Sequence, residues 1–133
     1  MRYMLDTDVC VTLLRQKSPE LRNKIKSFKP ETLGISVITL AELQYGIQKG
    51  QRQKLAQESL AKVLAPFKVV DFNHEAAIIY GQIRADLERV GERIGPYDLL
   101  IAAHAKFLGV TLVTGNVREF DRVDGLVVEN WLR

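Results

Sequence analysis

Three acidic residues that lie far apart in the sequence, Asp6, Glu42 and Asp98, share one local setting. Each lies where an apolar or glycine-bearing stretch runs into the start of a predicted helix. Because ligands of open α/β sheets bind at the carboxyl ends of the strands, acids at such junctions can converge on one spot. Converging carboxylates repel one another, and burial raises the cost, so a divalent cation is their natural partner. This pattern predicts a magnesium or manganese nuclease site.

A fourth polar cluster follows the next apolar run, Val110–Val113. Thr114 and Asn116 could orient water or a metal ion, and Glu119 could add a carboxylate. Turn formation explains the pair Gly115-Asn116 equally well.

Each of the three acids also has an ordinary explanation as part of a helix N-terminus. Either Asp6 or Asp8 can be an N-cap, and since one helix needs only one cap, Asp8 can take that role and leave Asp6 for function. Glu42 has capping-box spacing from Thr39, yet Ser36 is an equally good cap and would place Glu42 beyond capping reach.

Asp98 follows Pro96, which favours the first helical position, and an acid in the first turn interacts well with the helix dipole. The run Leu99–Ala103 is so apolar that the helix must be largely buried, and an acid that opens a buried helix needs a partner.

Other groups that could do chemistry are explained better by structure. We expect His74 in the first turn of a helix, His104 in the core or on the surface, and Trp131 in the core near the C-terminus. We find no Ser/His/Asp set, phosphate-cradling loop or Cys/His metal spacing in the sequence.

The length of 133 residues fits one domain, residues 1–133, with a single core. The one cysteine, Cys10, cannot form a disulfide within the chain and indicates a reducing, cytoplasmic compartment. Acids interrupt the apolar N-terminus from Asp6 onward, so we expect neither a signal peptide nor a membrane span.

The net charge of +3 is unevenly distributed along the chain. Between Arg15 and Lys62 ten basic residues stand against four acids, which gives +6 there and −3 for the remainder. A basic half beside an acidic pocket suits a polyanion held by its phosphates, although a solvated helical face explains the same charges.

Strand and helix patterns alternate along the chain. The predicted strands are Arg2–Leu5, Leu33–Ser36, Phe67–Val70, Val110–Val113 and Leu126–Val128. The first three predicted helices run from Asp8 to about Arg15, from Ser18 to Pro30, and from the end of the second strand to about Gln48. The next are Gln51–Ala65, a long helix that Asn73 caps and that carries Leu87, and a helix from Gly95-Pro96 to Gly109. This order predicts an α/β fold with a parallel sheet covered on both faces.

Four stretches of sequence together resemble one known family, and they span essentially the whole chain in the family's order. They are Tyr3–Asp8, Ile35–Gly46, Ile94–Ala105 and Val113–Phe120. Through them the chain resembles PIN-domain ribonucleases, and more closely the VapC toxins of type II VapBC toxin–antitoxin pairs.

The resemblance implies a PIN-like three-layer fold, with a central five-stranded parallel sheet flanked by helices. It implies that Asp6, Glu42 and Asp98 are catalytic and hold Mg²⁺, for which Mn²⁺ can substitute. Asn116 stands where many PIN domains carry another aspartate, and Glu119 could replace that acid directly or through water. Asp8 stands where related toxins often have asparagine.

The resemblance also implies an activity and partners. The substrate would be RNA, such as tRNA or ribosomal RNA, whose hydrolysis inhibits translation until a VapB-type antitoxin neutralises the toxin. Thr7, Ser36 and Thr114 could position water or phosphate oxygens. A homodimer or a toxin–antitoxin hetero-oligomer in the cytoplasm, without membrane contact, is the expected assembly.

Two other functions fit part of the sequence. Asp6-Thr-Asp8-Val resembles the opening of haloacid-dehalogenase-type phosphatases, but the later acidic pair of that class is missing after Leu126–Val128. A degenerate PIN domain that only binds RNA or protein is the non-enzymatic alternative, which Asp6, Glu42 and Asp98 argue against.

Overall fold

Five parallel strands form one sheet in the order β3-β2-β1-β4-β5, so the first strand lies at its centre. We describe residues 1–132 from a computed structural model. The strands are β1 (Tyr3–Leu5), β2 (Leu33–Ser36), β3 (Lys68–Val70), β4 (Thr111–Val113) and β5 (Val128–Glu129). The predicted five-stranded parallel sheet is therefore confirmed.

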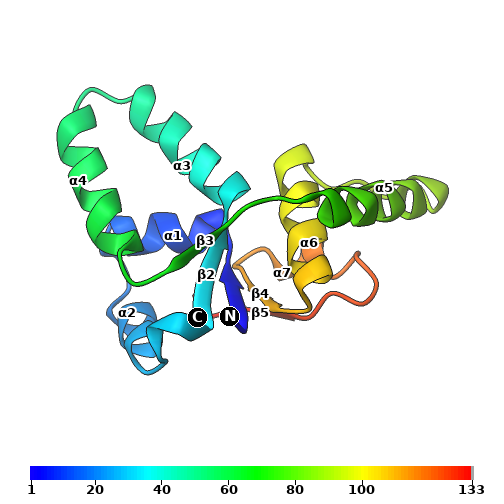
Figure 1. Cartoon of the computed structure of the whole chain (residues 1–133), viewed down its shortest axis with the longest axis horizontal. Coiled ribbons are helices and arrows are strands. Elements are labelled where there is room, and N and C mark those ends of the chain that lie inside the picture. The colour runs from blue at the N-terminus through cyan, green and yellow to red at the C-terminus, as the bar shows by residue number, and fades with distance from the viewer. Residues whose placement is uncertain (133) are drawn as a thin grey trace.

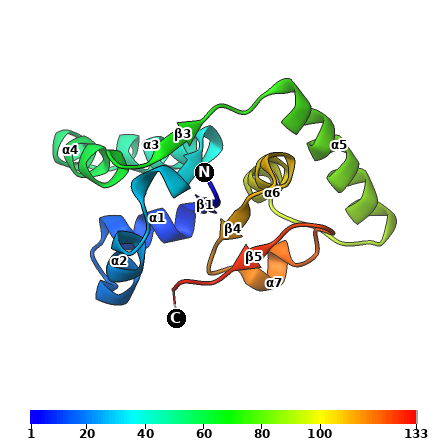
Figure 2. The ribbon, with the colours of Figure 1, turned by 60° about the horizontal axis from the view of Figure 1, so that its bottom comes forward.

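Helices cover both faces of this sheet, as Figures 1 and 2 show. Helices α1 to α4 lie on one side, and α5 to α7 lie on the other. The helices are α1 (Thr7–Leu14), α2 (Pro19–Lys26), α3 (Val37–Gln48), α4 (Gln53–Leu64), α5 (His74–Arg89), α6 (Pro96–Leu108) and α7 (Val117–Phe120), with a 3-10 turn at Pro30–Thr32. This arrangement is the expected three-layer α/β fold.

The two faces of the sheet carry separate apolar cores, because successive side chains of a strand point to opposite faces. Met4 of β1 is fully buried in the core with α5 and α6, and its neighbour Leu5 is fully buried in the core with α1 to α4. Leu112 and Val113 of β4 divide between the two cores in the same way. Burial on both faces explains why these strands are continuously apolar in the sequence.

The C-terminus closes the core on the side of α1 and α2. The Trp131 side chain is buried, and its ring stacks on Phe28 with 5.1 Å between ring centroids and an interplanar angle of 3°. Tyr3 packs against both rings. The prediction of Trp131 as a core residue is confirmed.

Three local predictions differ from the structure. Asp6, and not Asp8, is the N-cap of α1, because its side chain accepts the Thr7 N–H while Asp8 lies in the first turn. Strand β5 begins at Val128, later than predicted, and the four-residue helix α7 was not predicted. Both are too short for periodicity to mark them.

Candidate active site

Asp6 lies at the carboxyl end of β1, where both of its oxygens are occupied. Oδ1 accepts the Thr7 N–H at 2.8 Å, and Oδ2 accepts the Thr114 hydroxyl at 2.8 Å. The residue is only 4% exposed, and this burial raises its pKa to about 6. The charges of Asp8 and Glu42 raise it further, while the hydrogen bonds from Thr114 and Thr7 oppose the shift. A buried carboxylate with two acid neighbours is an electrostatic cost that a cation would relieve.

Glu42 comes from α3. From the sequence alone, either Ser36 or Thr39 could be the N-cap of this helix. Ser36 is the N-cap, since its hydroxyl accepts the Ile38 N–H at 3.0 Å. Glu42 therefore lies past the first turn, free of a capping-box role. Its Oε1 instead accepts a 2.7 Å hydrogen bond from the hydroxyl of Thr7. Thr7 thus joins the start of α1 to the acid of α3.

Asp98 lies in the first turn of α6, one position after Tyr97 and close to the other acids. Burial raises its pKa to about 7, helped by the charges of Asp6, Glu119 and Glu42. A hydrogen bond with Glu119 also raises it, since two carboxyls can share such a bond only when one is protonated. Acids from β1, α3, α6 and α7 are therefore close enough to disturb one another.

Asn116 and Glu119 lie at α7 and contact each other. The Asn116 side-chain amide donates to Oε2 of Glu119, and the Gly95 N–H donates to Oε1 of the same carboxylate at 2.9 Å. Glu119 is thus held beside the N-terminus of α6, which explains its influence on Asp98. The Asn116 N–H donates to the Thr114 hydroxyl at 3.0 Å.

An open pocket of about 500 Å³ lies over these groups. Its lining residues are Asp6, Thr7, Asp8, Val11, Thr12, Arg15, Asp98 and Asn116. Of the five site residues predicted from the sequence, Asp6, Asp98 and Asn116 line this pocket directly. Glu42 and Glu119 are not among its lining residues, but Thr7 and Asp98 connect them to it.

Asp8 also belongs to this pocket. Its Oδ2 accepts the Gly115 N–H at 2.8 Å, whereas Oδ1 is buried without a hydrogen-bond partner in residues 1–132. Burial raises the pKa of Asp8. A buried carboxylate oxygen left unpaired is costly, so this atom indicates a missing partner such as water or a cation.

A divalent cation fits the chemistry of this donor set. Mg²⁺ prefers carboxylate and other oxygen ligands, and burial together with the neighbouring acids raises the pKa of Asp6 and of Asp98, a cost that a bound cation would offset. Within the part of the chain that the structure describes, no three Asp, Glu, His or Cys side chains are already oriented around one metal position. Binding an ion would therefore require these side chains to turn toward it.

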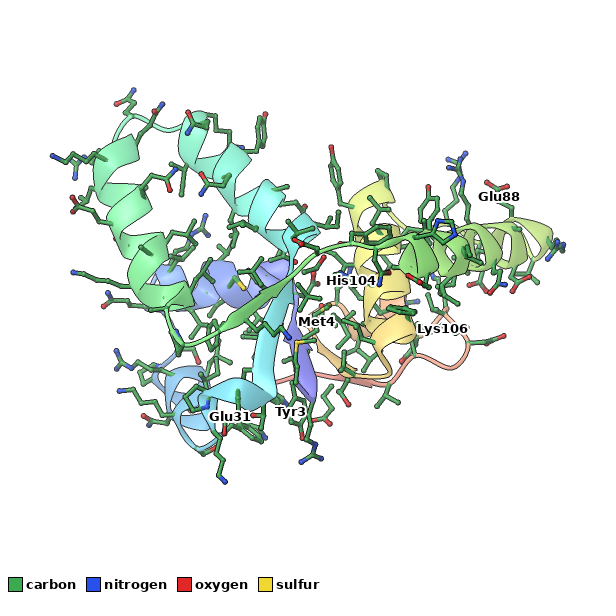
Figure 3. The ribbon with its side chains drawn as sticks, viewed as in Figure 1. Tyr3, Met4, Glu31, Glu88, His104 and Lys106 are labelled. Carbon is green, nitrogen blue, oxygen red and sulfur yellow. The ribbon has the colours of Figure 1, made fainter. Side chains whose placement is uncertain are left out.

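His104 is remote from this chemistry. It is 1% exposed, and Nδ1 lies 2.8 Å from the Ser36 hydroxyl. Its ring packs edge-on against Phe72 of the β3–α5 connection, which passes over α6 near His104 in Figure 3. Burial lowers its pKa. Its position agrees with the expectation of a core residue.

Three residues of the site have contacts that sequence reasoning did not predict. The hydroxyls of Thr7 and Thr114, which could position water or phosphate oxygens, donate to the carboxylates of Glu42 and Asp6. Arg15 was counted only among the surface charges, although it lines the acidic pocket. Its spacing from Asp8, seven residues along one helix, is the signal that could have placed it on the same helix face.

A hollow of about 600 Å³ between α5 and the start of α6 is larger than the acidic pocket. Its acids are Glu88 and Glu92, on the outer part of α5 and the loop after it. We assign the chemistry to the smaller pocket because Asp6, Asp8 and Asp98 meet there without an ion pair in residues 1–132. In the hollow, Glu88 is paired with Arg84 and Glu92 with Arg122.

Comparison with known proteins gives consistent matches over nearly the whole chain. The PIN domain family matches residues 3–126. A ribonuclease VapC2 from Rickettsia felis is 41% identical over 132 residues, which cover 98% of both chains. A tRNA(fMet)-specific endonuclease VapC from Salmonella typhimurium is 37% identical over 131 residues, again 98% of both. The structure of VapBC2 from Rickettsia felis, bound to a DNA fragment from its promoter, superposes with a TM-score of 0.94 at 39% identity, covering 98% of this chain and 99% of that one.

Proposed function

The chain belongs to the PIN-domain family, and we propose that it is a metal-dependent endoribonuclease, the toxin of a VapBC-type toxin–antitoxin pair. The observation that carries this proposal is the meeting of acids from four separate elements at the carboxyl ends of β1 and β4. Two relatives of full length carry the names of a ribonuclease and of a tRNA-specific endonuclease. The substrate class is therefore RNA, and tRNA is the first candidate.

Asp6, Glu42 and Asp98 would hold Mg²⁺ or Mn²⁺ in this proposal. When bound in such a site, the ion supplies Lewis acidity at the scissile phosphate and activates water for attack. Asn116 and Glu119, which contact each other beside Asp98, complete the catalytic set. No side-chain nucleophile is required.

The chain's own residues prepare this site by fixing the carboxylates. Thr114 and the Thr7 N–H set the orientation of Asp6, and the Thr7 hydroxyl sets that of Glu42. Gly95 and Asn116 hold Glu119 beside Asp98, and the charge of Glu119 helps to raise the pKa of Asp98. These hydrogen bonds restrict the carboxylates, which still have to turn toward the ion when it binds.

The proposal includes a VapB-type antitoxin as partner. Two bulky apolar side chains, Tyr45 on α3 and Leu55 on α4, are 67% and 56% exposed. An arginine of the antitoxin could bind the cluster of carboxylates through charge-assisted hydrogen bonds. A chain that is toxic alone and harmless when co-expressed with its antitoxin would support this part of the proposal.

No helix in residues 1–132 is long and apolar enough to cross a membrane. We propose that the protein acts in the cytoplasm, where its RNA substrates are found. The chain forms one domain in this proposal, which its single five-stranded sheet supports.

The test is cleavage of purified tRNA and of total cellular RNA by the antitoxin-free protein, with Mg²⁺ or Mn²⁺ and with EDTA. Asp98→Asn is the inactive variant, and Asp86→Asn is its matched control, because Asp86 is an exposed aspartate on α5 paired with Arg89. Discrete fragments that require both metal and Asp98 are the expected result. Intact RNA with both metals, or cleavage that survives Asp98→Asn, would contradict the assignment.

A further inference from the structure

The acidic pocket extends along α1 to a single basic residue. Asp8, Val11, Thr12 and Arg15 all line the pocket, and their spacing of three and four residues places them in one stripe of the helix. At 1.5 Å per residue, Arg15 lies about 10 Å from Asp8 along the helix axis. The stripe therefore leads from the candidate catalytic acids to a cation at the C-terminal end of α1.

Arg15 is the one basic residue among those that line this pocket. It is exposed, and the arginine side chains that pair with acids within residues 1–132 are those of Arg84, Arg89 and Arg122. Although it shares a pocket with three aspartates, its guanidinium forms no ion pair with them. An unpaired arginine at the rim of an acidic pocket is free to bind an anion.

A second arginine continues the same path. Arg22 of α2 is exposed and lines a small hollow of about 20 Å³ at the end of α1, together with Thr12, Leu13, Gln16 and Ser18. Thr12 borders both the hollow and the acidic pocket, so the two adjoin at this side chain. Figures 1 and 2 both place α2 beside the end of α1, away from the carboxyl ends of the strands.

We propose that Arg15 and Arg22 form a phosphodiester-binding track that holds the RNA strand next to the scissile phosphate. This proposal rests on the proposed ribonuclease function and adds the face over which the strand runs. Repulsion by the acids opposes binding of RNA at the pocket itself, and two guanidinium groups beyond the acids offset this by binding neighbouring phosphates. Arginine binds phosphate through paired N–H groups, which fixes the direction of the strand as well as adding affinity.

The path uses only the phosphate backbone, so its contribution is independent of RNA sequence and depends on salt. Each lost phosphate contact to a single strand reduces the slope of log affinity against log salt by about 0.7. This quantity separates a direct phosphate contact from a loss of structure, which would not change the slope in this defined way.

The experiment measures equilibrium binding of a labelled, mixed-sequence single-stranded RNA to the full chain over a series of salt concentrations. EDTA is present so that binding is measured without cleavage. The variants are Arg15→Ala, Arg22→Ala and Arg15→Lys. Arg89→Ala is the matched control, since it removes the same charge from an exposed arginine on α5.

We expect Arg15→Ala and Arg22→Ala each to bind roughly 5- to 30-fold more weakly, equivalent to one or two kcal/mol, and with a slope reduced by about 0.7. Arg15→Lys should keep the slope, because it keeps the charge. Arg89→Ala should bind RNA with the same affinity and the same salt slope as the unchanged chain.

An unchanged affinity and slope for both alanine variants would overturn the track, and so would an equal effect of Arg89→Ala. Weakened capture of the antitoxin with intact RNA binding would assign these arginines to the protein partner and also overturn it. If the unchanged chain cleaves no RNA, the ribonuclease function fails, whereas the binding slopes still decide on the track.

Discussion

The hydroxyl of Thr114 donates a 2.8 Å hydrogen bond to Oδ2 of Asp6, joining the ends of β4 and β1 across 108 positions of sequence. The same hydroxyl accepts a hydrogen bond from the Asn116 N–H at 3.0 Å, so it acts both as a donor and as an acceptor. Because parallel strands end at the same edge, two residues at opposite ends of the chain can fix one carboxylate. Thr114 is fully buried, so no water competes for this bond.

Thr114→Val removes this hydrogen bond while keeping the shape of the side chain. The bond lowers the pKa of Asp6, so its loss should raise that pKa above about 6 and disfavour the ionised acid. Loss of such a supporting bond typically costs roughly 10- to 100-fold in metal affinity or activity. We expect a decrease of that size in RNA cleavage at saturating Mn²⁺.

Two variants serve as controls for Thr114→Val. Thr114→Ser keeps the hydroxyl and should retain most activity. Thr32→Val removes a hydroxyl that bonds only the Lys29 carbonyl, far from the pocket, and should cleave normally. Full activity of Thr114→Val would show that Asp6 needs no such support.

The metal-free protein should lose stability as the pH rises from about 4 to about 7. Burial raises the pKa of Asp6 to about 6 and that of Asp98 to about 7, both from 3.8. In that range the native state binds more protons than the unfolded state, so the free energy of unfolding falls with increasing pH. Below about pH 4 these two acids make the free energy of unfolding no lower, and above about pH 7 the whole decrease has occurred.

Urea unfolding in EDTA at a series of pH values measures this dependence. Asp98→Asn, which cannot ionise at this position, should flatten the curve, whereas Asp86→Asn should not. A free energy of unfolding that increases between pH 4 and 7, for the unchanged chain, would contradict the assigned pKa shifts.

Mn²⁺ should stabilise the protein by binding the native acids. At one hundred times the dissociation constant, one bound ion adds about 2.7 kcal/mol, which corresponds to an increase in Tm of roughly 5–15 °C for a chain of this size. Thermal unfolding with and without Mn²⁺ at pH 7.5 measures the effect. The increase should be lost in Asp6→Asn and in Glu42→Gln.

Na⁺ at equal ionic strength controls for general screening of the acids. An equal increase in Tm with Na⁺ would mean that no specific divalent site exists. An increase that survives both substitutions would place the ion elsewhere on the protein.

Much of the fold could be predicted from the sequence because strong local signals mark its elements. Ser18-Pro19, Asn73 and Gly95-Pro96 begin helices where predicted, since caps and prolines act within one turn. The order of the strands in the sheet does not follow from such signals. It arises from packing between residues far apart in sequence, as in the pairing of β1 with both β2 and β4.

The candidate site was predicted in part, for a similar reason. Asp6, Glu42 and Asp98 stood out because acids interrupt apolar stretches. In the structure the charges of Asp6 and Glu42 both act on Asp98, but no three such side chains in residues 1–132 surround one metal position. The argument that Asp8 caps the helix and releases Asp6 was wrong, because one Asp6 oxygen caps α1 while the other faces Thr114. A single carboxylate can cap a helix with one oxygen and bond a distant residue with the other, and spacing along the sequence does not reveal this.

Two glycines offer a last prediction about stability that leaves the chemistry untouched. A Cβ at Gly34 in β2 would lie 2.8 Å from the Lys68 carbonyl oxygen of β3 and would also contact Met1. Lys68 is the residue that pairs with Gly34, so Gly34→Ala must push the two strands apart. We expect Gly34→Ala to lower the free energy of unfolding by roughly 1–3 kcal/mol.

Gly81 in α5 is the matched opposite case, because a Cβ there meets nothing within 4 Å. Gly81→Ala should raise the free energy of unfolding by roughly 0.5–1 kcal/mol, since alanine favours the helix interior. Both free energies are measurable by urea unfolding, and both variants should cleave RNA normally at temperatures well below their Tm. If Gly34→Ala were as stable as the unchanged chain, the close approach of β2 and β3 at this position would be wrong. If Gly81→Ala were less stable, that face of α5 would be covered, which its open surroundings in the single chain do not indicate.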